Sequence, residues 1–273
     1  MSFALAQVPA VPELVMPATA QVVVTTIVAL VAVVAVVVAA VLGRRHGTPL
    51  YLVVLLGGAL ASLNEPIADL LGGCIHPQRG GWQAFSTFDR PIPVWVVLAY
   101  GLFFGAVPLV VVALTRGTNP RKRFLAAVGV IFAANLLIEV PVIASGMYAY
   151  YGEQPFKVGV FPLYWLFING AGVAGVAVVL LRLGHLFHGA RLGWALLLPP
   201  AAQIAAYLVG MPVFSMYNTD AATPWKWLGA VATMLLGAAV LRALAQLVPE
   251  HQTAAAEVTR ESARAKSAVE VGS

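Results

Sequence analysis

Hydrophobic residues dominate the chain in seven long runs, and the short stretches between the runs carry most of the charged side chains. The runs cover residues 22–42, 50–73, 91–115, 124–147, 161–182, 193–215 and 225–248. Each reaches the length of about 20 residues that a helix needs to cross roughly 30 Å of hydrocarbon. The pattern therefore predicts an all-α, polytopic membrane protein, a seven-transmembrane helix bundle over residues 22–248.

The two flanking segments differ from the runs. We expect residues 1–21 to form an outer N-terminal segment, and residues 249–273, which are polar and rich in alanine, to form a disordered cytoplasmic tail. Hydrophobic residues make up 60% of the chain and charged residues only 10%, against about 25% charged residues in soluble domains. The composition therefore leaves no room for a sizeable soluble domain.

The basic residues predict the orientation of the bundle. Of the 16 lysines and arginines, 12 fall in one set of loops and the C-terminal tail, namely Arg44, Arg45, Arg116, Arg121, Lys122, Arg123, Arg182, Arg191, Arg242, Arg260, Arg264 and Lys266. Because basic loops stay in the cytoplasm, this bias predicts an N-out, C-in multi-pass protein, which we expect in the inner (plasma) membrane of a bacterium. Charges that set topology are not a binding patch, so we predict no nucleic-acid partner.

Three carboxylic acids lie inside the predicted spans. Glu65 and Asp69 belong to the second span and Glu139 to the fourth, and at 1.5 Å of rise per residue all three fall in the outer half of the membrane. A charged side chain in hydrocarbon costs about 2.5–3.5 kcal/mol, so these acids should face the bundle interior. Glu65 and Asp69 share a helix face, and two close acids place a proton donor beside a base.

Other polar and aromatic side chains are predicted at the same depth. The candidates for binding a substrate are Asn64, Trp95, Tyr100, Phe104, Asn135, Trp165, Asn169, Gln203 and Tyr207. The amides would orient the acids, and the aromatic faces would shape a pocket and stabilise a carbocation by cation–π attraction. Pro66 and Pro141 cannot donate a backbone hydrogen bond, so we expect them to free the carbonyls of Ser62 and Leu137 near the two glutamates.

Simpler interpretations stay open for several of these residues. Asn169 and Gln203 would also serve only to join helices through hydrogen bonds of about 0.6 kcal/mol each. Asp69 would also fit at the membrane interface, in contact with Arg79 or Arg90.

The chain shows no motif for a metal or a cofactor. Cys74 is the single cysteine, so no disulfide and no cysteine-based metal site is expected. His46 and His76 fall in loops and are predicted to be solvated. His185 and His188 have no carboxylate near them in sequence, so we predict no metal site there and no bound cofactor.

Two short stretches resemble known enzyme families. Residues 146–165, GMYAYYGEQPFKVGVFPLYW, resemble the tyrosine-rich segment of membrane carotenoid hydratases, which implies an acid on the preceding helix, where Glu139 stands. An acid after an asparagine in the second of seven spans is similar to the membrane-embedded terpene cyclases of meroterpenoid and indole-terpenoid pathways. That resemblance implies that Glu65 and Asp220 are catalytic. The tryptophan that often accompanies the cyclase glutamate is absent here, and Asp220 equally fits as the N-cap of the last span.

These observations predict a membrane-embedded, isoprenoid-modifying enzyme. It would be a proton-initiated terpene cyclase or hydratase, a lyase or isomerase in terpenoid biosynthesis, that uses Glu65, Asp69, Glu139 and Asp220 for general acid catalysis. Its partners would be an apolar isoprenoid-type substrate and membrane lipid. The alternative is a small-molecule or proton-coupled transporter. A retinal photoreceptor is disfavoured because no lysine lies deep in a span.

Overall fold

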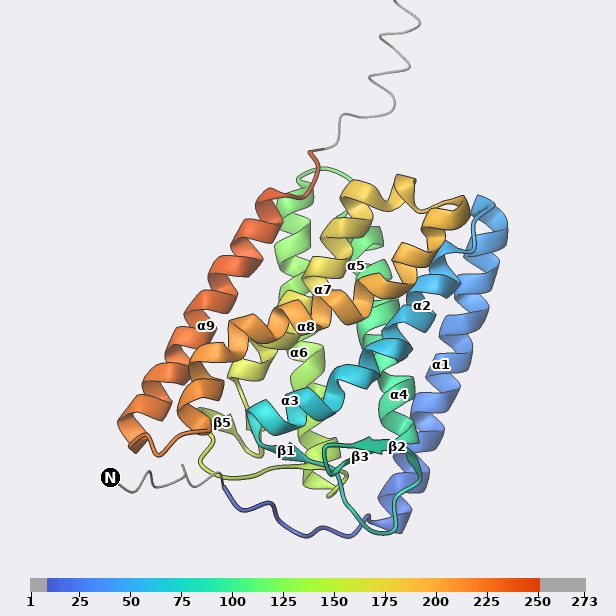
Figure 1. The fold of residues 1–273 in the computed structure, drawn as a ribbon. Coiled ribbons are helices and arrows are strands. Elements are labelled where there is room, and N and C mark those ends of the chain that lie inside the picture. Colours follow the sequence, from blue (N-terminus) through green and yellow to red (C-terminus); the bar gives the residue numbers. More distant parts are fainter. Residues whose placement is uncertain (1–8, 251–273) are drawn as a thin grey trace, which may run out of the picture.

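The computed structural model describes residues 9–250, which form a bundle of long helices packed side by side (Figure 1). Seven helical segments are long and apolar enough to cross a membrane: Ala18–His46, Leu50–Gly72, Val94–Thr115, Pro120–Ala144, Tyr164–Leu186, Gly189–Tyr217 and Thr223–Gln246. The predicted all-α fold is confirmed, and each of the seven hydrophobic runs overlaps one of these helical segments. Residues 1–8 of the predicted outer segment and residues 251–273 of the predicted tail lie outside the described residues.

Several of the seven segments are built from shorter elements. The first is α1 (Ala18–His46), and the second comprises α2 (Leu50–Ala61), the 3₁₀ turn η1 (Ser62–Asn64) and α3 (Glu65–Gly72). The third comprises α4 (Val94–Tyr100), the π-helical turn η2 (Gly101–Ala106) and α5 (Val107–Thr115). The others are α6 (Pro120–Ala144), α7 (Tyr164–Leu183) with η3 (Gly184–Leu186), η4 (Gly189–Arg191) with α8 (Leu192–Tyr217), and α9 (Thr223–Gln246).

Three small antiparallel sheets lie together at one end of the bundle, which we call the strand end. They pair β1 (Cys74–Ile75) with β4 (Ala149–Tyr150), β2 (Gln83–Thr87) with β3 (Arg90–Pro93), and β5 (Lys157–Val158) with β6 (Phe161–Pro162). β3 occupies the residues that the hydrophobic run had assigned to the start of the third span. The opposite end, where α1, α5 and α7 finish, is the basic end; Figure 1 shows it at the top.

The second span is interrupted by the 3₁₀ turn η1, and this turn changes the expected role of Pro66. The amide of Glu65 donates to the carbonyl of Ser62 in the 3₁₀ turn, so this carbonyl is not free and the prediction for it is wrong. Pro66 instead stands at the start of α3, where a missing amide hydrogen costs nothing because it would have no partner in the helix. The turn therefore ends α2 and begins a new helix at Glu65.

Two glycines allow the second and third spans to approach closely. A Cβ on Gly58 would lie 2.5 Å from the amide nitrogen of Gly105, and a Cβ on Gly105 would lie 2.8 Å from the Cα of Leu55. Small residues at such a crossing let helix backbones pack in direct contact. The crossing positions η2, and with it Tyr100 at the end of α4, beside the second span.

The close crossing predicts a marked effect of Gly105→Ala. The added methyl group meets backbone atoms, so we expect the free energy of unfolding in detergent to fall by about 1–3 kcal/mol and the Tm to fall with it. Gly129→Ala is the matched control, because no heavy atom lies within 4 Å of its added Cβ and alanine favours the helix. Equal Tm values for both variants would contradict the contact.

Candidate active site

Helix α3 carries the first two acids of the site. Glu65 is the first residue of α3 and accepts a hydrogen bond from the hydroxyl of Tyr100 on α4. Asp69 follows one turn later and is only 1% exposed. The two carboxylates therefore lie on one face of α3, as predicted, and both line the same cavity.

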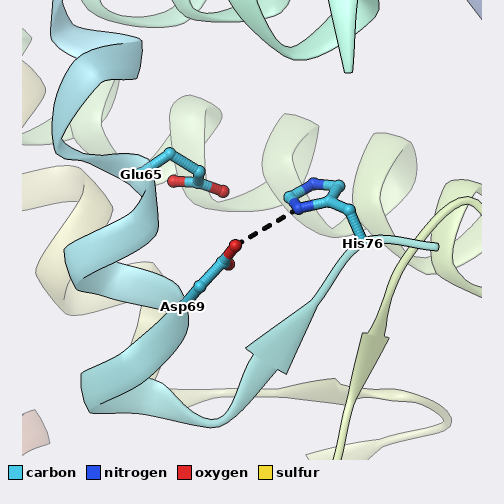
Figure 2. Close-up of side chains that lie close together, drawn as sticks. All are labelled: Glu65, Asp69 and His76. Carbon is cyan, nitrogen blue, oxygen red and sulfur yellow. Dashed lines mark hydrogen bonds and ion pairs between the residues drawn. The ribbon is translucent and has the colours of Figure 1, made fainter. Parts of the chain in front are cut away.

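His76 completes this group, contrary to the prediction that it is solvated. It follows β1 and is 2% exposed, and its Nδ1 lies 3.3 Å from Oδ2 of Asp69. Figure 2 shows the side chains of Glu65, Asp69 and His76 converging on one space. The pairing of β1 with β4 brings His76 here, because it holds the chain after α3 against the loop after α6.

The suggested contact of Asp69 with Arg79 or Arg90 is wrong. Arg79 forms an exposed ion pair with Glu13 at 3.0 Å. Arg90 is buried and donates to the hydroxyl of Tyr151 at 2.9 Å. Both arginines therefore have other partners, and Asp69 points inward to His76.

The charge of His76 is set by opposing effects. Burial lowers the pKa of an imidazole, because it disfavours the charged form. Asp69 raises it through its negative charge and its hydrogen bond, and Glu65 and Glu139 add to this, so that the pKa of His76 lies above its ordinary value of 6.5. Asp69 and His76 therefore form a buried pair that can hold a proton near neutral pH.

A hydrogen-bonded chain fixes the position of Tyr100. Nε2 of Gln203 donates to the hydroxyls of Tyr100 at 3.0 Å and Tyr207 at 2.7 Å, while its Oε1 accepts from Nδ2 of Asn64 at 3.1 Å. Asn64 also donates to the carbonyl of Pro200 at 2.9 Å. Gln203 is thus a buried residue that joins helices, as the simpler interpretation held, and it also positions the hydroxyl that binds Glu65.

The third acid comes from the opposite wall. Glu139 is half-buried on α6 and lines the same cavity as Glu65. Asn135, one turn earlier, forms a hydrogen bond with Glu139, and its Oδ1 accepts from Nδ2 of Asn169 on α7 at 3.4 Å. The predicted acids of the second and fourth spans therefore meet at one cavity.

Aromatic rings surround the acids. The rings of His76, Trp95 and Tyr148 are mutual neighbours, with centroids 5.5–6.0 Å apart. Tyr100 packs against Phe104 at 5.2 Å. These faces can stabilise a positive charge that develops beside the carboxylates.

The cavity has a volume of about 1050 Å³ and is lined mainly by apolar side chains. It contains ten of the thirteen predicted site residues: Glu65, Asp69, Trp95, Tyr100, Phe104, Asn135, Glu139, Trp165, Asn169 and Tyr207. Asn64 and Gln203 lie behind its wall. Asp220 is exposed in the turn before α9 and does not line the cavity, so the structure does not bring it to the other acids.

Among the lining residues that were not predicted, four form one wall beside the acids: His76, Cys74, Tyr148 and Tyr150. They flank or form the β1–β4 pair, whose two strands are far apart in sequence. The tyrosine-rich composition of residues 148–151 was the one signal in the sequence for this wall.

Glu65, Asp69 and His76 also have the residue types of a metal site. One ligand atom of each lies within 4.8 Å of the others. Two carboxylates and an imidazole suit Zn²⁺, Mn²⁺ or Fe²⁺. Two of these groups already bind each other and Glu65 binds Tyr100, whereas Oδ1 of Asp69 is buried and has no hydrogen-bond partner in the described part of the chain.

A scan against models of known protein families, a search of curated proteins and a search of solved structures gave no match to this chain. The function must therefore be argued from the cavity and its side chains.

The Asp69–His76 pair predicts the titration of His76. In ¹⁵N-histidine-labelled protein, the imidazole signals of His76 should titrate with a midpoint above 6.5, because carboxylates favour the charged form. Asp69→Asn should lower that midpoint, because burial still lowers the pKa of His76 while the negative charge that raised it is gone. Glu13→Gln, at a distant exposed acid, should leave it unchanged, and an unchanged midpoint in Asp69→Asn would refute the pairing.

Proposed function

We propose that this chain is an integral membrane enzyme that protonates an apolar, isoprenoid-type substrate, as a terpene cyclase or hydratase. The observation that carries the proposal is that Glu65 of α3 and Glu139 of α6 line one apolar cavity. The resemblances of short stretches to carotenoid hydratases and terpene cyclases supply the substrate class.

The surface of the bundle supports a place in the membrane. Leu30 and Val33 of α1 and Leu137 of α6 are more than 60% exposed, and many other large apolar side chains are exposed with them. Apolar surface of this extent is typical of contact with lipid. The excess of basic residues at the basic end favours its placement in the cytoplasm, with the strand end outside.

The chemistry follows from the positions of the groups. Glu65, held by Tyr100, would donate a proton to one carbon of a substrate double bond, and the neighbouring carbon would become a cation. The Asp69–His76 pair would resupply the proton. A second double bond would then attack this cation to close a ring, and the new cation would lose a proton from an adjacent carbon to Glu139 as a double bond forms. In a hydratase, water would instead add to the cation and lose a proton to Glu139.

The aromatic and apolar walls serve this reaction in two ways. Their faces stabilise the cation by cation–π attraction. They also keep bulk water from the site, so that the cation is not captured before the ring closes.

A proton-coupled carrier is the second candidate. The cavity-lining residues extend from His76 at the strand end to His46 and Arg116 at the basic end, which is the observation that favours it. A carrier would move its substrate across the membrane unchanged, whereas the enzyme would convert it.

Isosteric variants test the enzyme proposal. Protein in liposomes, supplied with linear prenyl alcohols and diphosphates, should yield cyclised or hydrated products detectable by mass spectrometry. Glu65→Gln and Glu139→Gln should each reduce the rate about 10²–10⁴-fold, because each removes a proton-transfer group but keeps its volume. Glu13→Gln should retain the wild-type rate. Uptake of unchanged substrate by the wild type would instead identify a carrier.

Chelation separates proton transfer by side chains from metal catalysis. Because Glu65, Asp69 and His76 each have a partner within the protein, we expect conversion to continue in excess EDTA or 1,10-phenanthroline. Elemental analysis of the purified protein gives the metal content independently. Loss of a stoichiometric metal together with activity, and recovery of both on adding Zn²⁺, Mn²⁺ or Fe²⁺, would assign the three residues as metal ligands.

A further inference from the structure

The cavity extends far beyond the acids, along one face of α1. Its lining includes Val24, Ile27, Val28, Val31, Val34, Ala35, Val38, Ala39, Leu42 and His46, which recur every three or four residues. That spacing places them on a single face of the helix. α1 packs against α2, α4 and η2, and this face borders an elongated space rather than a neighbouring helix.

The two ends of this space carry different ionisable groups. The acids Glu65, Asp69 and Glu139 lie toward the strand end, and Arg116, His46 and His185 line the cavity at the basic end. The side chains that line the stretch between them are mostly valine, leucine, alanine and phenylalanine. An anionic group would be attracted to Arg116, whereas His76, the one cation among the described residues that line the cavity near the acids, is already paired with Asp69, so an amphiphile would bind with its head at Arg116.

Basic residues at the end of an apolar helix commonly set only the topology. Here, however, Arg116 is distinguished from its neighbours by position. Arg44, Arg45 and Lys122 stand at the same end and do not line the cavity, whereas Arg116 does, together with two histidines from different spans. Arg116, His46 and His185 are exposed, and they line the basic end of the cavity as well as its surface.

The length of the space can be estimated from the helical rise of the third span. Tyr100, which binds Glu65, lies 16 residues before Arg116, the residue that directly follows the helical segment Val94–Thr115, and this separation corresponds to roughly 24 Å. One leaflet of hydrocarbon is only about 15 Å thick. An extended chain that reaches from Arg116 to Glu65 therefore has roughly 16–20 carbons along its main chain, because each C–C bond of about 1.5 Å advances the zigzag by about 1.2–1.5 Å.

We propose that the substrate is a long-chain anionic amphiphile. Its phosphate, diphosphate or carboxylate head binds at Arg116, His46 and His185, and its apolar chain of about four or five isoprene units, each with four carbons along the main chain, follows α1 toward the acids. The double bond farthest from the head then meets Glu65 and Glu139. This inference rests on the proposed function and names the substrate class of the same site.

Direct binding tests the inference without relying on turnover. In nanodiscs of neutral lipid, the quenching of tryptophan fluorescence can report binding, because Trp95 and Trp165 line the cavity. A C20 prenyl diphosphate should bind at least about ten times more tightly than the C20 alcohol, and more tightly than a C10 diphosphate. Arg116→Ala should weaken binding of the C20 diphosphate about tenfold and leave binding of the alcohol unchanged.

Lys122→Ala is the matched control, because it removes a positive charge at the same end but outside the cavity. It should bind the diphosphate as the wild type does. Equal affinity for the alcohol and the diphosphate, or equal effects of Arg116→Ala and Lys122→Ala, would overturn the inference. Equally tight, Arg116-dependent binding of phosphatidylglycerol would also overturn it, since that result describes a site for membrane lipid.

Failure here can be told apart from failure of the enzyme proposal. Glu65→Gln and Glu139→Gln should still bind the diphosphate, because the head contacts the other end. Conversion of a neutral prenyl substrate without preference for anionic heads would leave the enzyme in place and remove this inference. Selective binding of the C20 diphosphate without any conversion would do the reverse.

Discussion

The free-energy cost of placing carboxylates among apolar helices governs the arrangement of this site. An isolated acid in such surroundings would be costly, so each of the three acids has a partner from another position in the chain. Tyr100 binds Glu65, His76 pairs with Asp69, and Asn135 bonds to Glu139. These partners fix the side chains in place, and the rings around them exclude water. These contacts lower the free-energy cost of burying the acids. In the proposed enzyme they also hold the acids in position for proton transfer.

The geometry of the site depends on three features away from the acids. The Gly58–Gly105 crossing brings the third span close enough for Tyr100 to reach Glu65. The β1–β4 pair holds His76 over α3, and Gln203 fixes the hydroxyl of Tyr100 from α8. The site is thus assembled by parts of the second, third, fourth, fifth and sixth spans and by the strand end.

The sequence predicted the features that follow from local physics. Hydrophobic run length located the seven helices, and helical rise placed Glu65 and Glu139 at one depth, where they do share a cavity. It failed where the outcome depended on contacts between distant segments. His76 was assigned to solvent because it falls in a loop, whereas the pairing of Cys74–Ile75 with residues 149–150 places it against Asp69, Trp95 and Tyr148. Asp220 was favoured by a resemblance, but the bend before α9 keeps it at the surface.

The π-helical turn at Gly101–Ala106 has a consequence for how this site could vary. A π turn holds one more residue than an α turn, so the two halves of the third span are offset in phase. The half before it presents Tyr100 to Glu65, and the half after it ends at Thr115, directly before Arg116. Removing a single residue within the turn would rotate one half by about 100° against the other. In the proposed enzyme, insertion or deletion at this turn would therefore change which substrate fits while Glu65, Asp69 and Glu139 stay in place.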